Sequence, residues 1–113
     1  MTIKHISNWK DKRTDESRVV EEDLRQAGFD RVDAYRYNSA SLRVRVIDKR
    51  FESIPREERD SIVEPFIEKL PRSTQADIVT LVLLAPTEFE QPNETFREFM
   101  LNTEFENPSP SML

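Results

Sequence analysis

The stretch Leu42–Val63, LRVRVIDKRFESIPREERDSIV, decides the fold of this chain. Its first five residues alternate apolar and basic side chains, which is the period-two pattern of a strand buried on one face. Its second half changes to helical spacing. Pro55 suits the first turn of a helix, because the missing N–H of a proline has no intrahelical partner there. The stretch therefore predicts a strand that runs into a helix, with the dipeptide Arg50-Phe51 at the corner.

The flanking sequence predicts an α+β fold around this corner. It contains helices at 14–27, 53–70 and 93–101, strands at 29–37, 42–47 and 77–85, and a short helix at 87–90. Pro65 interrupts the second helix, so we expect a kink or two short helices, with Pro65 in the first turn of the second one. Because a helical crossover joins the second strand to the third, these two strands should be parallel. The result is a three-stranded mixed sheet with helices packed on one face, in the order α-β-β-α(kinked)-β-α.

The length of 113 residues fits a single small domain. We assign residues 14–101 to that domain and residues 1–13 to a loosely ordered leader, in which Trp9 is expected to anchor the leader on the core. Residues 102–113, which contain two prolines, are expected to form an extended tail.

The turn between the first two strands determines which side chains share a face. If the turn at 38–41 is tight, Tyr37 lies opposite Leu42 and Tyr35 lies opposite Val44. Both tyrosines would then share the core face. The other face would carry the arginines of this hairpin, Arg36, Arg43 and Arg45. A slip of one residue in the register would exchange the two sets.

Composition excludes several classes of function. The net charge of −5 disfavours nucleic-acid binding, which usually requires a basic surplus. The chain has no cysteine, only one histidine (His5) and only one glycine (Gly28). Thiolate metal sites, glycine-rich phosphate loops and the GxxG loop of KH domains are therefore excluded. No apolar run approaches the length of a membrane span, so a cytoplasmic protein is expected. We also expect no cofactor. We find no catalytic constellation and predict that the protein is not an enzyme.

A set of residues along 18–90 gives the chain a family resemblance. They are Leu24, Ala27–Phe29, Val44–Asp48, Arg50-Phe51, Arg59, Ile62–Leu70, Ala76 and Pro86–Phe89. In this order they resemble the BolA family, which has a class II KH-like fold. The resemblance implies an adaptor-like protein that shares an iron–sulfur cluster with a monothiol glutaredoxin.

The chain departs from the family pattern at the ligand position. BolA proteins carry a histidine after the arginine that Arg59 resembles, and this chain has Asp60 there and Ser61 next. An aspartate is a harder and poorer ligand for cluster iron than an imidazole. The resemblance therefore carries over the fold and an adaptor-like role, and it implies glutaredoxin only if cluster sharing survives this change.

The leading hypothesis is a non-enzymatic module that binds a protein partner. The candidate residues for this contact are Arg36, Arg43, Arg45, Arg50, Arg59 and Asp60. The alternative function is nucleic-acid binding through the arginine-bearing sheet face. The arginines of the sheet have a structural role as a further alternative. They would then pair with local carboxylates, or with Glu104 and Glu106 if the tail folds back.

Overall fold

The computed structural model describes residues 9–90 and 96–111. Its elements, in chain order, are η1 Trp9–Lys12, α1 Asp15–Gln26, β1 Arg31–Asn38, β2 Ser41–Ile47, η2 Lys49–Phe51, α2 Arg56–Ile67, α3 Arg72–Asp77, β3 Ile78–Leu84, α4 Pro86–Glu90 and α5 Phe96–Glu106. Within the described ranges, no helix is both long enough and apolar enough to cross a membrane.

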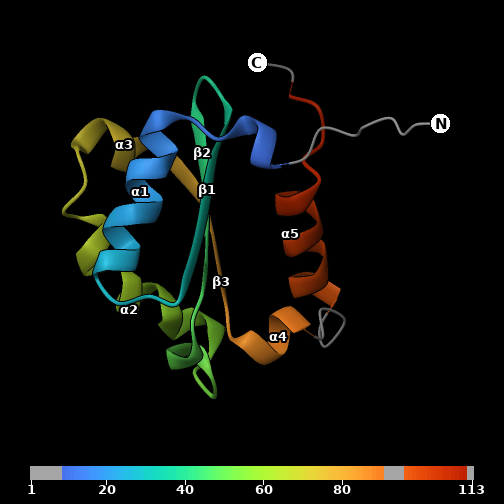
Figure 1. The fold of residues 1–113 in the computed structure, drawn as a ribbon. Coiled ribbons are helices and arrows are strands. Elements are labelled where there is room, and N and C mark those ends of the chain that lie inside the picture. Colours follow the sequence, from blue (N-terminus) through green and yellow to red (C-terminus); the bar gives the residue numbers. More distant parts are fainter. Residues whose placement is uncertain (1–8, 91–95, 112–113) are drawn as a thin grey trace.

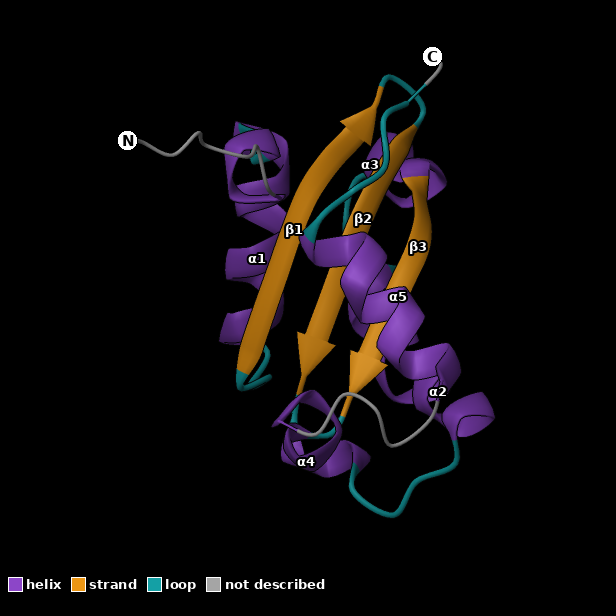
Figure 2. Cartoon of the chain, turned by 90° about the vertical axis from the view of Figure 1, so that its right-hand side faces the viewer, coloured by secondary structure: helices purple, strands orange, loops and turns teal. Residues whose placement is uncertain are grey.

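The three strands form one mixed sheet in the order β1-β2-β3 (Figure 2). Strands β1 and β2 are antiparallel, as expected for a hairpin. Strands β2 and β3 are parallel, which confirms the prediction from the helical crossover. Because β2 pairs on both sides, β1 and β3 are the two edge strands.

The predicted register of the hairpin is wrong by one residue. Tyr35 lies opposite Arg43, and Arg36 lies opposite Leu42. The cause is an irregularity between Arg36 and Asn38, which shifts the pairing by one position and moves side chains to the opposite face. Tyr35 therefore shares a face with Arg43 and Arg45, whereas Arg36 lies on the face of Leu42.

Helices cover both faces of the sheet, and the prediction of helices on one face only is wrong (Figure 1). On one face, α1 and α2 pack on the sheet to form a core that we call the α2 core; its buried members include Val20, Leu24, Phe51, Val63, Val32, Val44, Val46 and Leu83. On the other face, η1 and α5 form a smaller core that we call the α5 core. Its buried members are Trp9, Tyr35, Ile47, Val82, Leu84 and Phe105.

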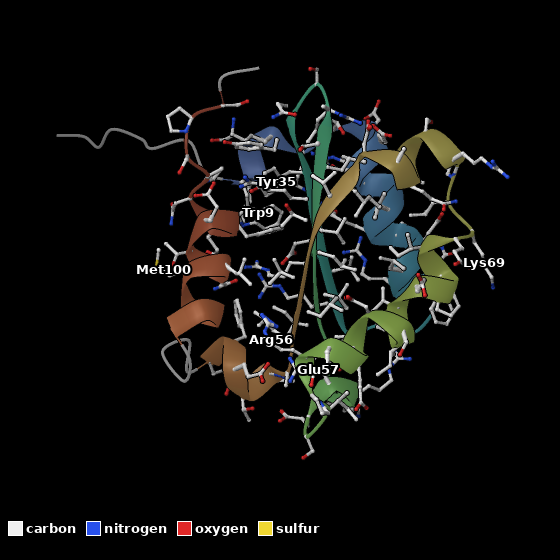
Figure 3. All side chains as sticks on the ribbon, turned by 180° about the vertical axis from the view of Figure 1, so that it is seen from behind. Trp9, Tyr35, Arg56, Glu57, Lys69 and Met100 are labelled. Carbon is white, nitrogen blue, oxygen red and sulfur yellow. The ribbon has the colours of Figure 1, made fainter. Side chains whose placement is uncertain are left out.

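Trp9 anchors the N-terminal segment in the α5 core, as predicted. Its ring centroid lies 6.3 Å from that of Tyr35 and 5.7 Å from that of Phe105. Figure 3 shows Trp9 and Tyr35 between the sheet and α5. The chain from Asn102 to Glu106 was expected to be extended, but it continues α5, because Phe105 is buried in this core.

The break in the crossover falls at a different proline from the one predicted. Helix α2 runs through Pro65 to Ile67, so Pro65 lies in its last turn. The second helix, α3, begins directly after Pro71, where a turn was expected. Proline suits the start of a helix, and Pro71 takes that role instead of Pro65.

Candidate functional site

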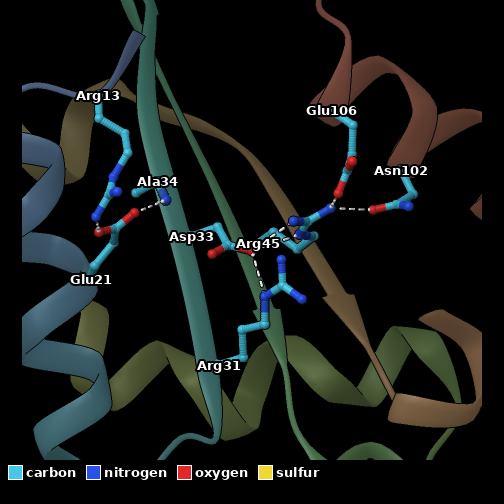
Figure 4. A network of polar contacts seen from close by, with 8 residues as sticks. All are labelled: Arg13, Glu21, Arg31, Asp33, Ala34, Arg45, Asn102 and Glu106. Atoms are coloured by element: carbon cyan, nitrogen blue, oxygen red, sulfur yellow. Dashed lines mark hydrogen bonds and ion pairs between the residues drawn. The ribbon is translucent and has the colours of Figure 1, made fainter. Parts of the chain in front are cut away.

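Arg45 is the centre of a buried polar network under α5 (Figure 4). Its side chain is 0% exposed. The guanidinium Nη2 donates to Asp33 Oδ2 at 2.6 Å, and Nη1 donates to Glu106 Oε2 at 2.6 Å and to Asn102 Oδ1 at 2.7 Å. Arg31 Nε donates to the same Asp33 oxygen at 3.1 Å. Arg45 therefore ties β2 to β1 and α5, and it offers no surface to a partner.

Arg43 contacts the last turn of α5, at Glu104. Its Nη1 donates to Glu104 Oε2 at 3.0 Å and to the hydroxyl of Tyr35 at 3.1 Å. The same guanidinium lies 3.6 Å from the ring centroid of Tyr37. Burial raises the pKa of Tyr35 above its ordinary value of 10.0, although the hydrogen bond from Arg43 opposes this. These contacts confirm the structural reading in which the tail glutamates fold back onto the arginines.

Arg36 lies on the opposite face of the sheet, because of the shift in register. Its Nη2 donates to Glu16 Oε1 on α1 and to Asp77 Oδ2 on α3, both at 2.8 Å. Hydrogen bonds with these carboxylates raise the pKa of Arg36, and the bonds from Arg36 and Thr74 lower the pKa of Glu16 below 4.5. The three arginines predicted to share one face are therefore divided between the two faces.

Arg50 packs beside its own strand-to-helix corner. Its Nε donates to Asp48 Oδ1 at 3.0 Å, and its guanidinium lies 4.0 Å from the ring centroid of Phe29. Burial acts against ionisation of Asp48, but hydrogen bonds from Arg50 and from the N–H of Asp30 lower its pKa. The arginine remains exposed at this corner, so it keeps one open side.

Arg59 is buried, at 4% exposure, and closes one end of β3. Its two terminal nitrogens donate to Glu88 Oε1 and Oε2 at 2.7 and 2.8 Å, and Nη1 also donates to the carbonyl of Leu83 at 3.0 Å. A bidentate pair of this kind is directional and strong. Arg59 therefore fastens α2 to β3 and to α4.

Asp60 follows Arg59 on α2 but points to a different environment. It is exposed, and it lines two clefts beside the outer edge of β3. One cleft, of about 380 Å³, is lined by Asp60, Glu64, Ile67, Gln75, Ile78, Val79 and Leu81. The other, of about 300 Å³, is lined by Arg56, Glu57, Asp60, Leu81, Leu83 and Leu101. Because they share Asp60 and Leu81, the two clefts adjoin along the strand; we call them together the β3-edge groove.

Along α2 the groove has three carboxylates and one cation, Arg56, so that wall is acidic on balance, and along β3 the groove is apolar. Glu57, Asp60 and Glu64 are exposed on the helix, and Figure 3 shows Glu57 and Arg56 on this part of α2. Val79 on the strand is 64% exposed, which is high for a large apolar residue in a sheet. An acidic wall beside an apolar strand suits a ligand with both basic and apolar side chains.

Sequence reasoning named Asp60 but missed Val79 and Leu81. The run at 77–85 is apolar on both faces, a pattern that predicts a strand covered on both sides or nearly so. A signal was nevertheless present, because a hairpin followed by a parallel crossover leaves the third strand at the edge of the sheet. The apolar residues at its beginning were therefore candidates for an exposed position.

Among the residues that the structure describes, no group of three or more acidic or imidazole side chains has the arrangement needed to hold a metal ion. Comparisons with protein-family models, with curated protein sequences and with solved structures find no match.

Proposed function

We propose that this protein is a non-enzymatic interaction module that binds a protein partner at the β3-edge groove. The observation that carries the proposal is the pair of adjoining clefts beside β3, with Asp60 at their junction. Apolar side chains flanked by charged ones are typical of a surface that another protein covers.

The partner is expected to be a protein and not a nucleic acid. Carboxylates of Glu57, Asp60 and Glu64 line the groove, and they would repel phosphate groups. Nucleic-acid binding through the arginine-bearing sheet face would require α5 to leave that face, because Arg43 and Arg45 pair with Glu104 and Glu106. The net charge of −5 also disfavours it.

A BolA-like fold is part of the same proposal. The element order through β3 supports it, as does the placement of the residues that carried the resemblance. Phe51 is fully buried in the α2 core, and Arg59 closes the end of β3. On this view α4 and α5 are additions that cover the second face of the sheet, and glutaredoxin is a partner to test.

A charge-reversal experiment in the native host tests the function. The tagged protein is purified with its partner, and so is an Asp60→Arg/Glu64→Arg variant. The matched control is Glu22→Arg/Asp23→Arg, which makes the same change of charge at exposed positions of α1. Circular dichroism checks that both variants are folded.

We expect a stoichiometric partner with the wild type and with the control, and loss of that partner with the Asp60/Glu64 variant. Equal recovery from both variants would place the binding surface elsewhere. Absence of any stoichiometric partner, together with measurable turnover of a substrate, would refute the proposal of a non-enzymatic module.

A further inference from the structure

The two edges of the sheet are closed to different extents. At the β1 edge, the N–H of Ala34 donates to Glu21 Oε2 at 2.8 Å. Glu21 is a buried residue of α1, and Arg13 forms an ion pair with it (Figure 4). A side chain thus occupies a backbone group that a further strand would need, which is a common way to protect an edge.

The β3 edge is closed only near its end. In a parallel ladder, alternate residues direct their N–H and C=O groups to opposite sides. The carbonyl of Leu84 accepts from the N–H of Asp48, whereas the carbonyl of Leu83 accepts from Arg59 on the outer side. By this alternation, the backbone groups of Leu81 also point outward. The pairing with β2 then passes from Thr80 to Ile78 and skips Val79, so the alternation does not extend to that residue. Between described residues, no hydrogen bond to the outward groups of Leu81 is found.

The β3-edge groove lies beside these outward groups. An added strand would pair with Leu81 and would direct alternate side chains to one face of the sheet. On the α2 side those side chains would meet Asp60 and Glu64. Basic side chains there would form ion pairs, and apolar ones would cover Val79.

We propose that the partner adds an extended segment of alternating apolar and basic residues to the outer edge of β3. This inference rests on the proposed function and specifies how the groove is filled. A second copy of this chain fits the edge less well. Pairing of β3 with itself about a twofold axis would place both α2 helices on the same face, where Asp60 and Glu64 of the two copies would repel each other.

A pair of synthetic peptides tests the proposal directly. The first alternates valine with lysine over about nine residues, which lies within the usual range of strand lengths; the second has glutamate in place of lysine. Binding is followed by amide chemical shifts and by hydrogen exchange of the ¹⁵N-labelled full chain. We expect the lysine peptide to shift and protect the amide of Leu81, and to bind at least about tenfold more tightly than the glutamate peptide.

Two pairs of variants separate strand addition from general attraction to an acidic protein. Asp60→Lys/Glu64→Lys should reverse the preference between the peptides, whereas Glu22→Lys/Asp23→Lys, with the same net charge, should keep it. Leu81→Pro removes an outward N–H and should weaken binding by about tenfold or more. Leu81→Ala keeps that N–H and should have a smaller effect.

Several results would overturn the inference. These are equal binding of the two peptides, shifts that map away from β3, and equal affinity of the two Leu81 variants. Self-association of the peptide-free protein that Leu81→Pro abolishes would identify a second copy as the occupant. Each of these results is compatible with loss of the native partner in the Asp60→Arg/Glu64→Arg variant. The proposed function and this inference can therefore fail separately.

Discussion

Replacement of Arg45 by alanine is expected to destabilise the fold strongly, because it leaves a carboxylate without its main partner under α5. The side chain of Asp33 is only 10% exposed, so water cannot fully replace the lost hydrogen bonds. Removal of one member of a buried ion pair typically costs about 3–5 kcal/mol. Arg31 keeps one contact with Asp33, and Glu106 is 36% exposed, so we expect about 3 kcal/mol, at the lower end of that range.

The free energy of unfolding, measured by chemical denaturation at pH 7, checks this value. Arg18→Ala is the matched control, since it removes an exposed arginine from α1 and should change stability by no more than about 0.5 kcal/mol. The double variant Arg45→Met/Asp33→Leu leaves no buried charge and should be more stable than Arg45→Ala. A loss below about 1 kcal/mol for Arg45→Ala, or a double variant no more stable than the single one, would refute the reasoning.

Three further perturbations test other parts of the structure. Phe105→Ala should lower the free energy of unfolding by about 3–5 kcal/mol and change the fluorescence of Trp9, since the two rings are in contact; unchanged fluorescence would contradict the docking of α5. Thr14→Ala should lower the free energy of unfolding by about 0.5–2 kcal/mol, because the hydroxyl of Thr14 accepts a hydrogen bond from the N–H of Ser17 in the first turn of α1. Thr14→Ser should restore stability, and equal stability of the two variants would contradict this cap. Burial opposes ionisation of Glu88, but hydrogen bonds from Arg59 lower the pKa of this carboxyl below 4.5. This carboxylate therefore adds stability above pH 4.5 that is lost as the pH falls through its lowered pKa, and an unfolding titration of Glu88→Gln should show a shallower acid slope than the wild type.

Much of the architecture could be predicted from local patterns. The alternation in β2 and the helical spacing after it located the strand-to-helix corner around Arg50-Phe51, and the length of the crossover required β2 and β3 to be parallel. Pairing of the sheet arginines with Glu104 and Glu106 was foreseen only as an alternative that required the tail to fold back, and the tail was predicted to be extended. The corner and the parallel pairing each follow from periodicity or chain length, which a sequence states directly.

The candidate site could be predicted only in part. Asp60 was named for its place after Arg59, and it lies in the β3-edge groove. Arg45 and Arg59 were named as contacts for a partner, yet both are buried and paired within the chain. Alternation alone shows that a basic face exists, but whether another element covers that face depends on residues about sixty positions away.

The sequence by itself determined the order of the elements and the pairing of the strands, because apolar periodicity and crossover length are local properties. Tertiary structure alone decided three features. An irregularity before Asn38 set the hairpin register, since a shift of one residue exchanges the faces of a strand. Burial of Phe105 extended α5 over the arginines and converted a predicted binding face into a second core. Glu21 closed the β1 edge, whereas Arg59 closed only the end of β3 and left the backbone of Leu81 facing the β3-edge groove, beside the exposed side chain of Val79.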